Sequence, residues 1–154
     1  MDLWYFAYGR NMNISGLCGR IGGEPLLMCR GILPGFKLMF NKVPGPEAGT
    51  GYSNIVPAPE EYVEGLLYLI TEEALSRLDD FEGVSGGHYT RGKVNVWNIE
   101  QQGWVTAETY MAVRTDDALK PPRTYLEEII KASKLVGLSW EWVSRLEKFM
   151  VEAV

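Results

Sequence analysis

The chain has 154 residues, 46% of them hydrophobic, which favours one domain with an ordinary globular core. Its net charge of −5 argues against nucleic acid as a partner and against adsorption to an anionic membrane surface. The chain has a single histidine, His88, so a histidine-rich zinc site is excluded, and we expect His88 in an ordinary loop. Cys18 and Cys29 are expected to be buried thiols rather than a disulfide framework.

The N-terminal region predicts a strand followed by a short helix. Its first residues lack the basic and apolar regions of a signal peptide, and no apolar run reaches the roughly 20 residues of a membrane span, so we expect a cytoplasmic protein. The aromatic run Leu3–Tyr8 predicts a buried strand that Gly9 ends. Asn13 predicts the cap of a helical turn that reaches about Gly19.

The middle of the chain is rich in extended segments. Glycine and proline within Leu26–Asn41 predict two extended segments broken by a turn, followed by a loop over Val43–Gly51. Two further strands are predicted at Ser53–Pro57 and Val63–Ile70. Within the second of them, Gly65 predicts a bulge or a close approach of another backbone.

A helix and a hairpin follow. Thr71 is placed to cap a helix over Glu72–Phe81, with apolar side chains on one side. A glycine-rich turn at Gly83–Gly87 comes next. The segments His88–Ile99 and Trp104–Val113 then predict a β-hairpin.

Two helices are predicted at the C-terminal end. Pro121 and Pro122 begin one over Arg123–Val136, and Ser139 caps another that runs to about residue 151. Its aromatic side chains predict packing against the rest of the chain or against a second copy, so we expect a monomer or a homodimer. The elements together predict a single α+β domain over residues 1–154, with a mainly antiparallel, barrel-like sheet and helices at its edges.

The segment Tyr5–Asn11 is the first candidate for a binding site. An aromatic strand runs through Gly9 into the start of a helix, where backbone amides lack a strand or helix partner. Such amides can hold a carboxylate, as helix N-termini and backbone nests do. A buried strand followed by an ordinary turn fits the same residues.

Glu82 is the candidate acid of a catalytic site. It lies between Phe81 and the Gly83-Val84 pair, an apolar setting that can desolvate a carboxyl, raise its pKa and make it a proton shuttle. A solvated loop glutamate is the alternative. Three tyrosines are candidate hydrogen-bond donors or core residues: Tyr89, Tyr110 and Tyr125.

Taken in order, several segments resemble the γ-glutamylcyclotransferases. Tyr5–Asn11, with the sequence Y-F-A-Y-G-R-N, resembles the Y-F-A-Y-G-S-N motif that opens the family, and Leu78–Val84 resembles the L-D-x-x-E-G-V segment that bears its catalytic glutamate. Gly35–Phe40 resembles a strand of the family, and Pro121–Tyr125 resembles its proline-led helix with a binding tyrosine. The ordered set covers about residues 3–148.

This resemblance implies a β-barrel with flanking helices and an acyltransferase-type enzyme of glutathione metabolism that needs no cofactor. The α-amine of a small γ-glutamyl substrate attacks its own γ-carbonyl carbon, which yields 5-oxoproline and a free amino acid or amine. Glu82 is implied as the general acid/base. The implied substrate-binding residues are Tyr5, Phe6, Ala7, Tyr8, Gly9, Arg10, Asn11 and Tyr125.

Arg10 departs from the motif, because the family usually has serine there. A role of the backbone N–H at this position is unaffected, whereas a role of the serine hydroxyl is lost. An arginine can grip a carboxylate or fill the pocket. Two alternatives therefore stay open: a protein that binds a γ-glutamyl-like metabolite without turning it over, and a transferase that acts on a γ-glutamyl group attached to a larger carrier.

Overall fold

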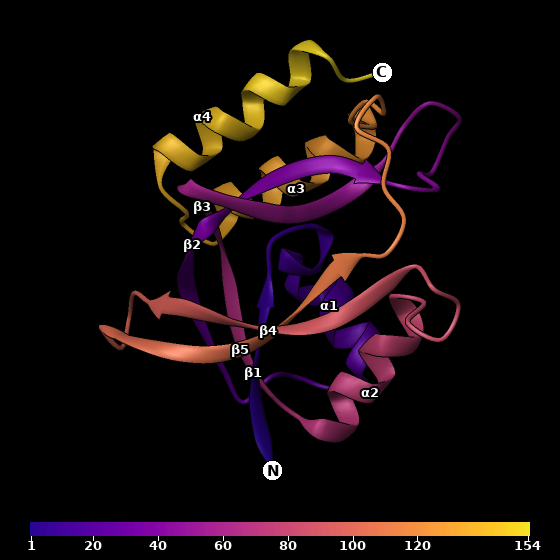
Figure 1. Ribbon diagram of the computed structural model, residues 1–154. Helices are drawn as coiled ribbons and strands as arrows, with labels where there is room; N and C mark the ends of the chain where they lie inside the picture. The colour runs from indigo at the N-terminus through magenta and orange to yellow at the C-terminus, as the bar shows by residue number, and fades with distance from the viewer.

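The sheet of this protein closes into a barrel (Figure 1). The computed structural model describes residues 1–154, and its strands are β1 (Asp2–Ala7), β2 (Leu27–Lys42), β3 (Tyr52–Thr71), β4 (Tyr89–Asn98) and β5 (Gly103–Ala112). They follow one another round the barrel in the order β1-β3-β2-β4-β5. Neighbours are antiparallel except β1 and β5, whose short parallel pairing closes the ring. The predicted α+β class with a mainly antiparallel barrel is confirmed.

Helices complete the fold, and three of them begin at a predicted cap. They are α1 (Ile14–Ile21), α2 (Glu72–Phe81), α3 (Arg123–Leu135) and α4 (Trp140–Lys148), with the 3₁₀ turns η1 (Arg10–Met12) and η2 (Phe149–Val151). The side chains of Asn13, Thr71 and Ser139 each accept a hydrogen bond from the backbone N–H three residues later. These bonds satisfy donors that the start of a helix leaves free.

Strands β2 and β3 are longer than predicted. The turn expected within Leu26–Asn41 is wrong, because β2 is one strand of 16 residues, and the two strands predicted after the loop are parts of β3. Gly35 adopts the left-handed conformation (φ 84°) where the pairing with β3 shifts between Pro34 and Phe36. Pairing with β3 resumes beyond Gly35 in a shifted register, so the chain passes a bulge at this point instead of reversing.

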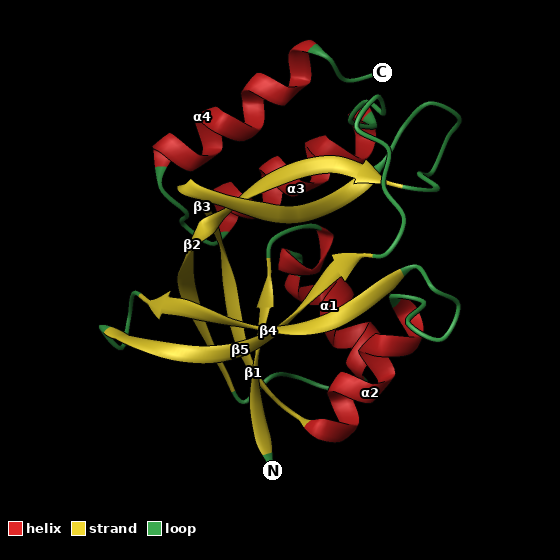
Figure 2. Ribbon diagram, viewed as in Figure 1, coloured by secondary structure: helices red, strands yellow, loops and turns green.

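The register shift at Gly35 divides the β2–β3 ribbon into two parts. The part before it belongs to the barrel, where Ile32 pairs with Trp97 of β4. The part beyond it lies beside α3 and α4, above the barrel in the views of Figures 1 and 2, whereas α1 and α2 flank the barrel itself. The predicted hairpin of β4 and β5 is confirmed over all ten residues of each strand.

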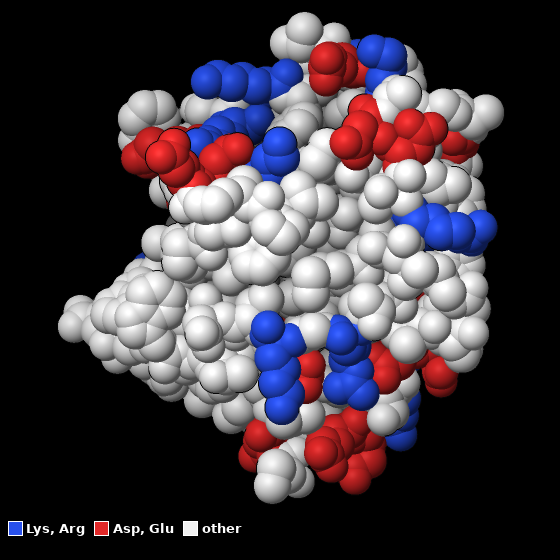
Figure 3. All heavy atoms as spheres, viewed as in Figure 1, with Lys and Arg blue, Asp and Glu red and all other residues white.

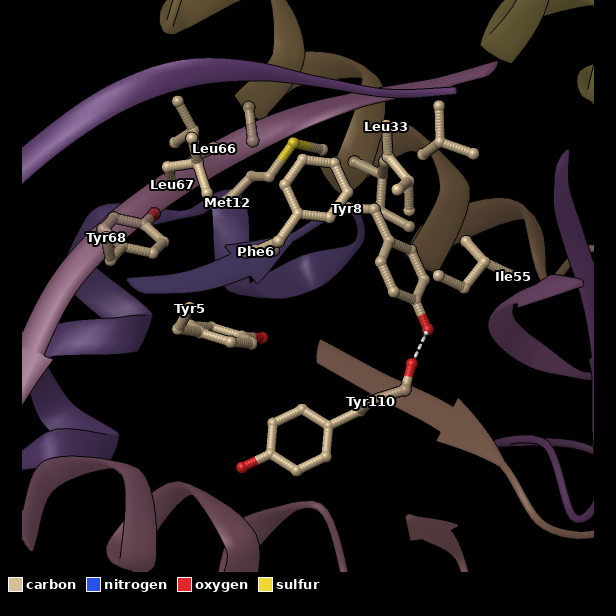
Figure 4. Packing of buried hydrophobic residues seen from close by; sticks show 14 of the residues in the cluster. Tyr5, Phe6, Tyr8, Met12, Leu33, Ile55, Leu66, Leu67, Tyr68 and Tyr110 are labelled. Atoms are coloured by element: carbon tan, nitrogen blue, oxygen red, sulfur yellow. Dashed lines mark hydrogen bonds between the residues drawn. The ribbon is translucent and has the colours of Figure 1, made fainter. Parts of the chain in front are cut away.

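Alternation along β1 separates two kinds of side chain. Phe6 is fully buried and packs beside Met12, whereas Tyr5 points to the other side of the strand (Figure 4). Successive strand residues face opposite sides, so a single strand supplies both the hydrophobic core and a polar site. The apolar core continues beyond the barrel to α4, where Trp142 is 2% exposed.

The surface carries mixed charges, and no helix combines the length and the apolar composition that crossing a membrane requires. On the face drawn in Figure 3, basic and acidic side chains are interspersed. Cys29 is buried as predicted, but Cys18 is only partly buried. It follows the buried Leu17 on α1, and one helical step turns its side chain away from the core.

Candidate active site

A cavity of about 290 Å³ opens where the ends of β1, β2 and α2 meet the start of β3. It brings together most of the predicted site residues although they come from distant parts of the chain. Those that line it are Tyr5, Tyr8, Gly9, Arg10, Asn11, Glu82 and Tyr125. The cavity also receives the candidate donors Tyr89 and Tyr110.

Two residues expected in the binding loop, Phe6 and Ala7, do not line the cavity. Phe6 faces the apolar side of β1 with Met12 (Figure 4), which follows from strand alternation. Ala7 carries only a methyl group, and its backbone lies against Gly65, where an added Cβ would come within 2.3 Å of the Ala7 carbonyl oxygen. The close approach predicted for Gly65 is therefore present.

Glu82 stands directly after α2, one residue beyond Phe81. Its Oε1 accepts a hydrogen bond of 2.8 Å from Nδ2 of Asn11. Burial raises the pKa of the Glu82 carboxyl above its ordinary value, while the Asn11 hydrogen bond and then the positive charges of Arg20, Arg10 and Lys42 act in the opposite direction. The carboxyl is thus desolvated yet held in one orientation, which suits a group that takes up and returns a proton.

Asn11 connects Glu82 to an arginine that the sequence did not single out. Nδ2 of Asn11 also donates to the Tyr5 hydroxyl (2.9 Å), and its Oδ1 accepts from Arg20 Nη1 (2.7 Å). Arg20 lies in the last turn of α1. It is far along the chain from both Asn11 and Glu82, so no local sequence pattern indicates its contact with Asn11.

Gly9 has a spatial reason to be glycine. A Cβ added there would come within 2.5 Å of Ser53 Oγ, which itself lies 2.7 Å from the Tyr125 hydroxyl. The N–H of Gly9 has no backbone partner, and Arg10 and Asn11 open a 3₁₀ turn, whose first N–H groups have no partner within the turn. The N–H groups of Gly9 and Arg10 therefore have no backbone partner beside the cavity. Sequence reasoning missed Ser53 because only the fold brings it to Tyr125.

The tyrosines around the cavity are held by hydrogen bonds. Tyr8 donates to the backbone oxygen of Tyr110 (2.6 Å), a bond that Figure 4 draws as a dashed line. The Tyr110 hydroxyl donates to Asp79 (2.6 Å), and Tyr89 donates to the backbone oxygen of Ser53 (2.8 Å). Burial raises the pKa of these tyrosines, so their hydroxyls stay protonated at neutral pH.

Lys42 and His88 also line the cavity, and sequence reasoning missed their place in it. His88, which was expected in an ordinary loop, lies with Nδ1 2.8 Å from Nζ of Lys42 at the end of β2. No group of three or more histidine, cysteine, aspartate and glutamate side chains is arranged to hold a metal ion. The groups that line the cavity include a carboxyl, a side-chain amide, tyrosine and serine hydroxyls and basic side chains.

Comparisons with known proteins find relatives that share this fold. The AIG2-like family matches residues 62–146. The γ-glutamylcyclotransferases of Mus musculus and Bos taurus are 27% and 28% identical to this chain, over 93% and 92% of its length and 76% of theirs. A solved γ-glutamyl cyclotransferase structure superposes with a TM-score of 0.85 at 27% identity, covering 96% of this chain and 87% of the other.

Proposed function

The chain belongs to the AIG2-like family and has the γ-glutamylcyclotransferase-like fold, and from this we propose that it cyclises a γ-glutamyl group to 5-oxoproline with release of an amino acid or amine. The observation that carries the proposal is Glu82, a partly buried carboxyl held by Asn11 at the wall of a cavity with free backbone amides. We place this reaction in the cytoplasm, on a small substrate and without a cofactor.

Glu82 moves two protons in this reaction, one after the other, from the attacking nitrogen to the leaving nitrogen. An ordinary glutamate of pKa ~4.3 is a weak base for an α-ammonium of pKa ~8, a gap worth roughly 5 kcal/mol. Burial raises the pKa of Glu82 and narrows that gap. Glu82 takes the proton from the ammonium, and the freed amine forms a bond to the γ-carbonyl carbon. The bond from that carbon to the leaving nitrogen then breaks as Glu82 gives the proton to this nitrogen. The restored carboxylate takes the second proton, which the new ring nitrogen must lose, and passes it to the released amine, which leaves as an ammonium.

Orientation supplies much of the remaining rate. Nucleophile and electrophile belong to one molecule, and well-oriented intramolecular reactions reach effective molarities of about 10⁵–10⁸ M. In this proposal the N–H groups of Gly9 and Arg10 hold the α-carboxylate of the glutamyl group, and the Tyr125 hydroxyl positions the substrate. The glutamyl chain is then folded with its amine towards Glu82.

The position of Arg10 supports catalysis over binding alone. Its side chain is exposed, and its guanidinium carbon lies 5.7 Å from the centre of the Tyr125 ring. Arg10 therefore stands at the mouth of the cavity and leaves the contact between Asn11 and Glu82 intact. Its backbone N–H remains available, as the role of this position in anion binding requires.

The test is to incubate the protein with γ-glutamyl dipeptides and γ-glutamyl amines and to measure 5-oxoproline and the released amine. We expect Glu82→Gln to lower kcat by roughly 10²- to 10⁴-fold, the usual contribution of a positioned acid–base group. Asp80→Asn, an exposed neighbour on the same helix, is the matched control and should keep wild-type turnover. Wild-type turnover by Glu82→Gln would refute the role of Glu82, and tight binding without product would make the protein a binder.

A further inference from the structure

Lys42 is a cavity residue that the proposed reaction does not use. Its side chain is 4% exposed at the end of β2. Nζ lies 2.8 Å from His88 Nδ1 and 3.3 Å from the backbone oxygen of Pro44. The rings of Tyr52 and Tyr89 lie 5.4 Å and 5.6 Å from it, so aromatic faces enclose the ammonium.

This buried ammonium has no carboxylate of the chain beside it. The ion pairs of the protein involve Arg30, Arg91, Lys134 and Arg145, and none includes Lys42. A charge removed from water is costly unless it is paired, and aromatic faces compensate only part of that cost. Burial and the nearby Arg114 lower the pKa of Lys42, and the negative charge of Glu82 opposes them only in part.

The cavity as a whole has more positive than negative groups. Arg10, Arg20 and Lys42 line it, and Glu82 is the only acidic side chain that does. Arg20 is bound to Asn11 and Arg10 stands at the mouth, which leaves Lys42 as the inner cation that forms no ion pair with a carboxylate of the chain. A ligand with an excess of negative charge therefore fits the cavity best.

We propose that Lys42 is a specificity-determining residue that binds a carboxylate on the departing half of the substrate, with His88 as its positioning residue. This inference rests on the proposed cyclotransferase function. The amides after β1 take the glutamyl carboxylate, so the anion left for Lys42 is a second carboxylate. The favoured substrate class is then a γ-glutamyl amino acid or peptide with a free carboxylate near the scissile bond, in preference to a γ-glutamyl derivative of a simple amine.

His88 keeps Lys42 in place through the loop that follows Glu82. An ammonium can only donate, so His88 Nδ1 is the acceptor of the hydrogen bond from Lys42 Nζ. The ring is packed against Gly83, where an added Cβ would come within 2.7 Å of His88 Cδ2. Gly83, the residue after Glu82, thus sets the position of His88, and His88 sets that of Lys42.

The test compares γ-glutamyl-alanine with γ-glutamyl-alanine amide, which differ only in the carboxylate. For the wild-type protein we expect kcat/KM to favour the acid by roughly 10- to 100-fold, as for one charge-assisted hydrogen bond. Lys42→Met should bring this ratio close to one by raising KM for the acid, with the amide little affected, and Lys42→Arg should restore part of it. His88→Gln should lower the ratio without abolishing it. Lys37→Met, on the same strand outside the cavity, is the control.

Binding of both ligands to Glu82→Gln, with and without Lys42→Met, is measured by calorimetry and separates the two proposals. A preference for the acid that depends on Lys42, without turnover by the wild-type protein, would support the role of Lys42 and overturn the cyclotransferase function. Turnover by the wild-type protein, with an acid-to-amide ratio of kcat/KM that Lys42→Met leaves unchanged, would support the cyclotransferase function and overturn the role of Lys42. An equal loss on both ligands would assign Lys42 to the glutamyl carboxylate and overturn the inference.

Discussion

The orientation of one amide group decides how Glu82 is held. The guanidinium of Arg20 can only donate, so Asn11 must turn its oxygen to Arg20 and its NH₂ group to Glu82 and Tyr5. Arg20 thereby acts on Glu82 twice. It orients the amide that binds the carboxylate, and its charge opposes the rise in the pKa of Glu82 that burial causes.

Arg20→Gln tests this relay. Removing the guanidinium raises the pKa of Glu82 further, so a larger share of Glu82 is protonated at a given pH and unable to accept a proton. We expect the acidic limb of the kcat/KM profile to move to higher pH and the plateau to fall by roughly 10- to 100-fold, the worth of one hydrogen bond to a charged group. Arg77→Gln, which loses a bond to the end of α1 away from the cavity, should leave the limb where it is. An unmoved limb in Arg20→Gln would contradict the relay.

At the scale of the elements, the ends of helices carry both stability and chemistry. The C-terminal end of α2 presents Glu82, where the helix dipole disfavours negative charge and adds to the effect of burial. At the N-terminal end of α4, a buried acid has a structural role. Glu64, 5% exposed, accepts from both the N–H (3.0 Å) and the hydroxyl of Ser139. Two chain segments far apart in sequence are joined at this point.

Ser139→Ala and Thr71→Ala should differ in cost although both remove a helix cap. Thr71→Ala loses the cap alone and should lower the free energy of unfolding by about 1 kcal/mol. Ser139→Ala also leaves Glu64 with one donor fewer in a buried place, so we expect a loss of about 2–3 kcal/mol. Urea unfolding measures both. Equal losses would show that the contact with Glu64 adds nothing, and Ser139→Ala should keep its activity because it lies outside the cavity.

At the scale of the molecule, the β2–β3 ribbon joins the barrel to the helical layer formed by α3 and α4. The same two strands pass through both parts without interruption, and the site lies between them, with Glu82 on the barrel side and Tyr125 on α3. Trp142 of α4 packs near Tyr62 of the ribbon, with ring centres 5.9 Å apart. Two strands that run through both parts and a shared core predict one cooperative unit.

We therefore predict a single unfolding transition for substitutions in either part. Trp142→Ala in the helical layer should cost about 3–5 kcal/mol, and Leu75→Ala beside the barrel should cost about 2–5 kcal/mol, since both side chains are almost fully buried. Calorimetric and van't Hoff enthalpies of unfolding should agree for both variants. A second transition in Trp142→Ala would show that the helical layer unfolds separately and would contradict the single domain predicted for residues 1–154.

Local features of this protein could be predicted from its sequence because they depend on near neighbours. The caps at Asn13, Thr71 and Ser139 each involve a residue three positions away, and the β4–β5 hairpin closes over a short turn. The ordered motifs also placed Glu82 and the turn after β1 in one site, and the structure puts both at one cavity.

Only the tertiary structure decided which other residues reach that cavity and how β2 is shaped. Whether Gly35 makes a turn or a bulge depends on a partner strand that continues beside it. Lys42 and His88 are 46 positions apart and Asn11 and Glu82 are 71 apart, so no periodicity or cap signal connects them. Contacts of this kind arise from the closure of the barrel. The charge around Glu82 is therefore a property of the folded chain, although each residue that supplies it stands plainly in the sequence.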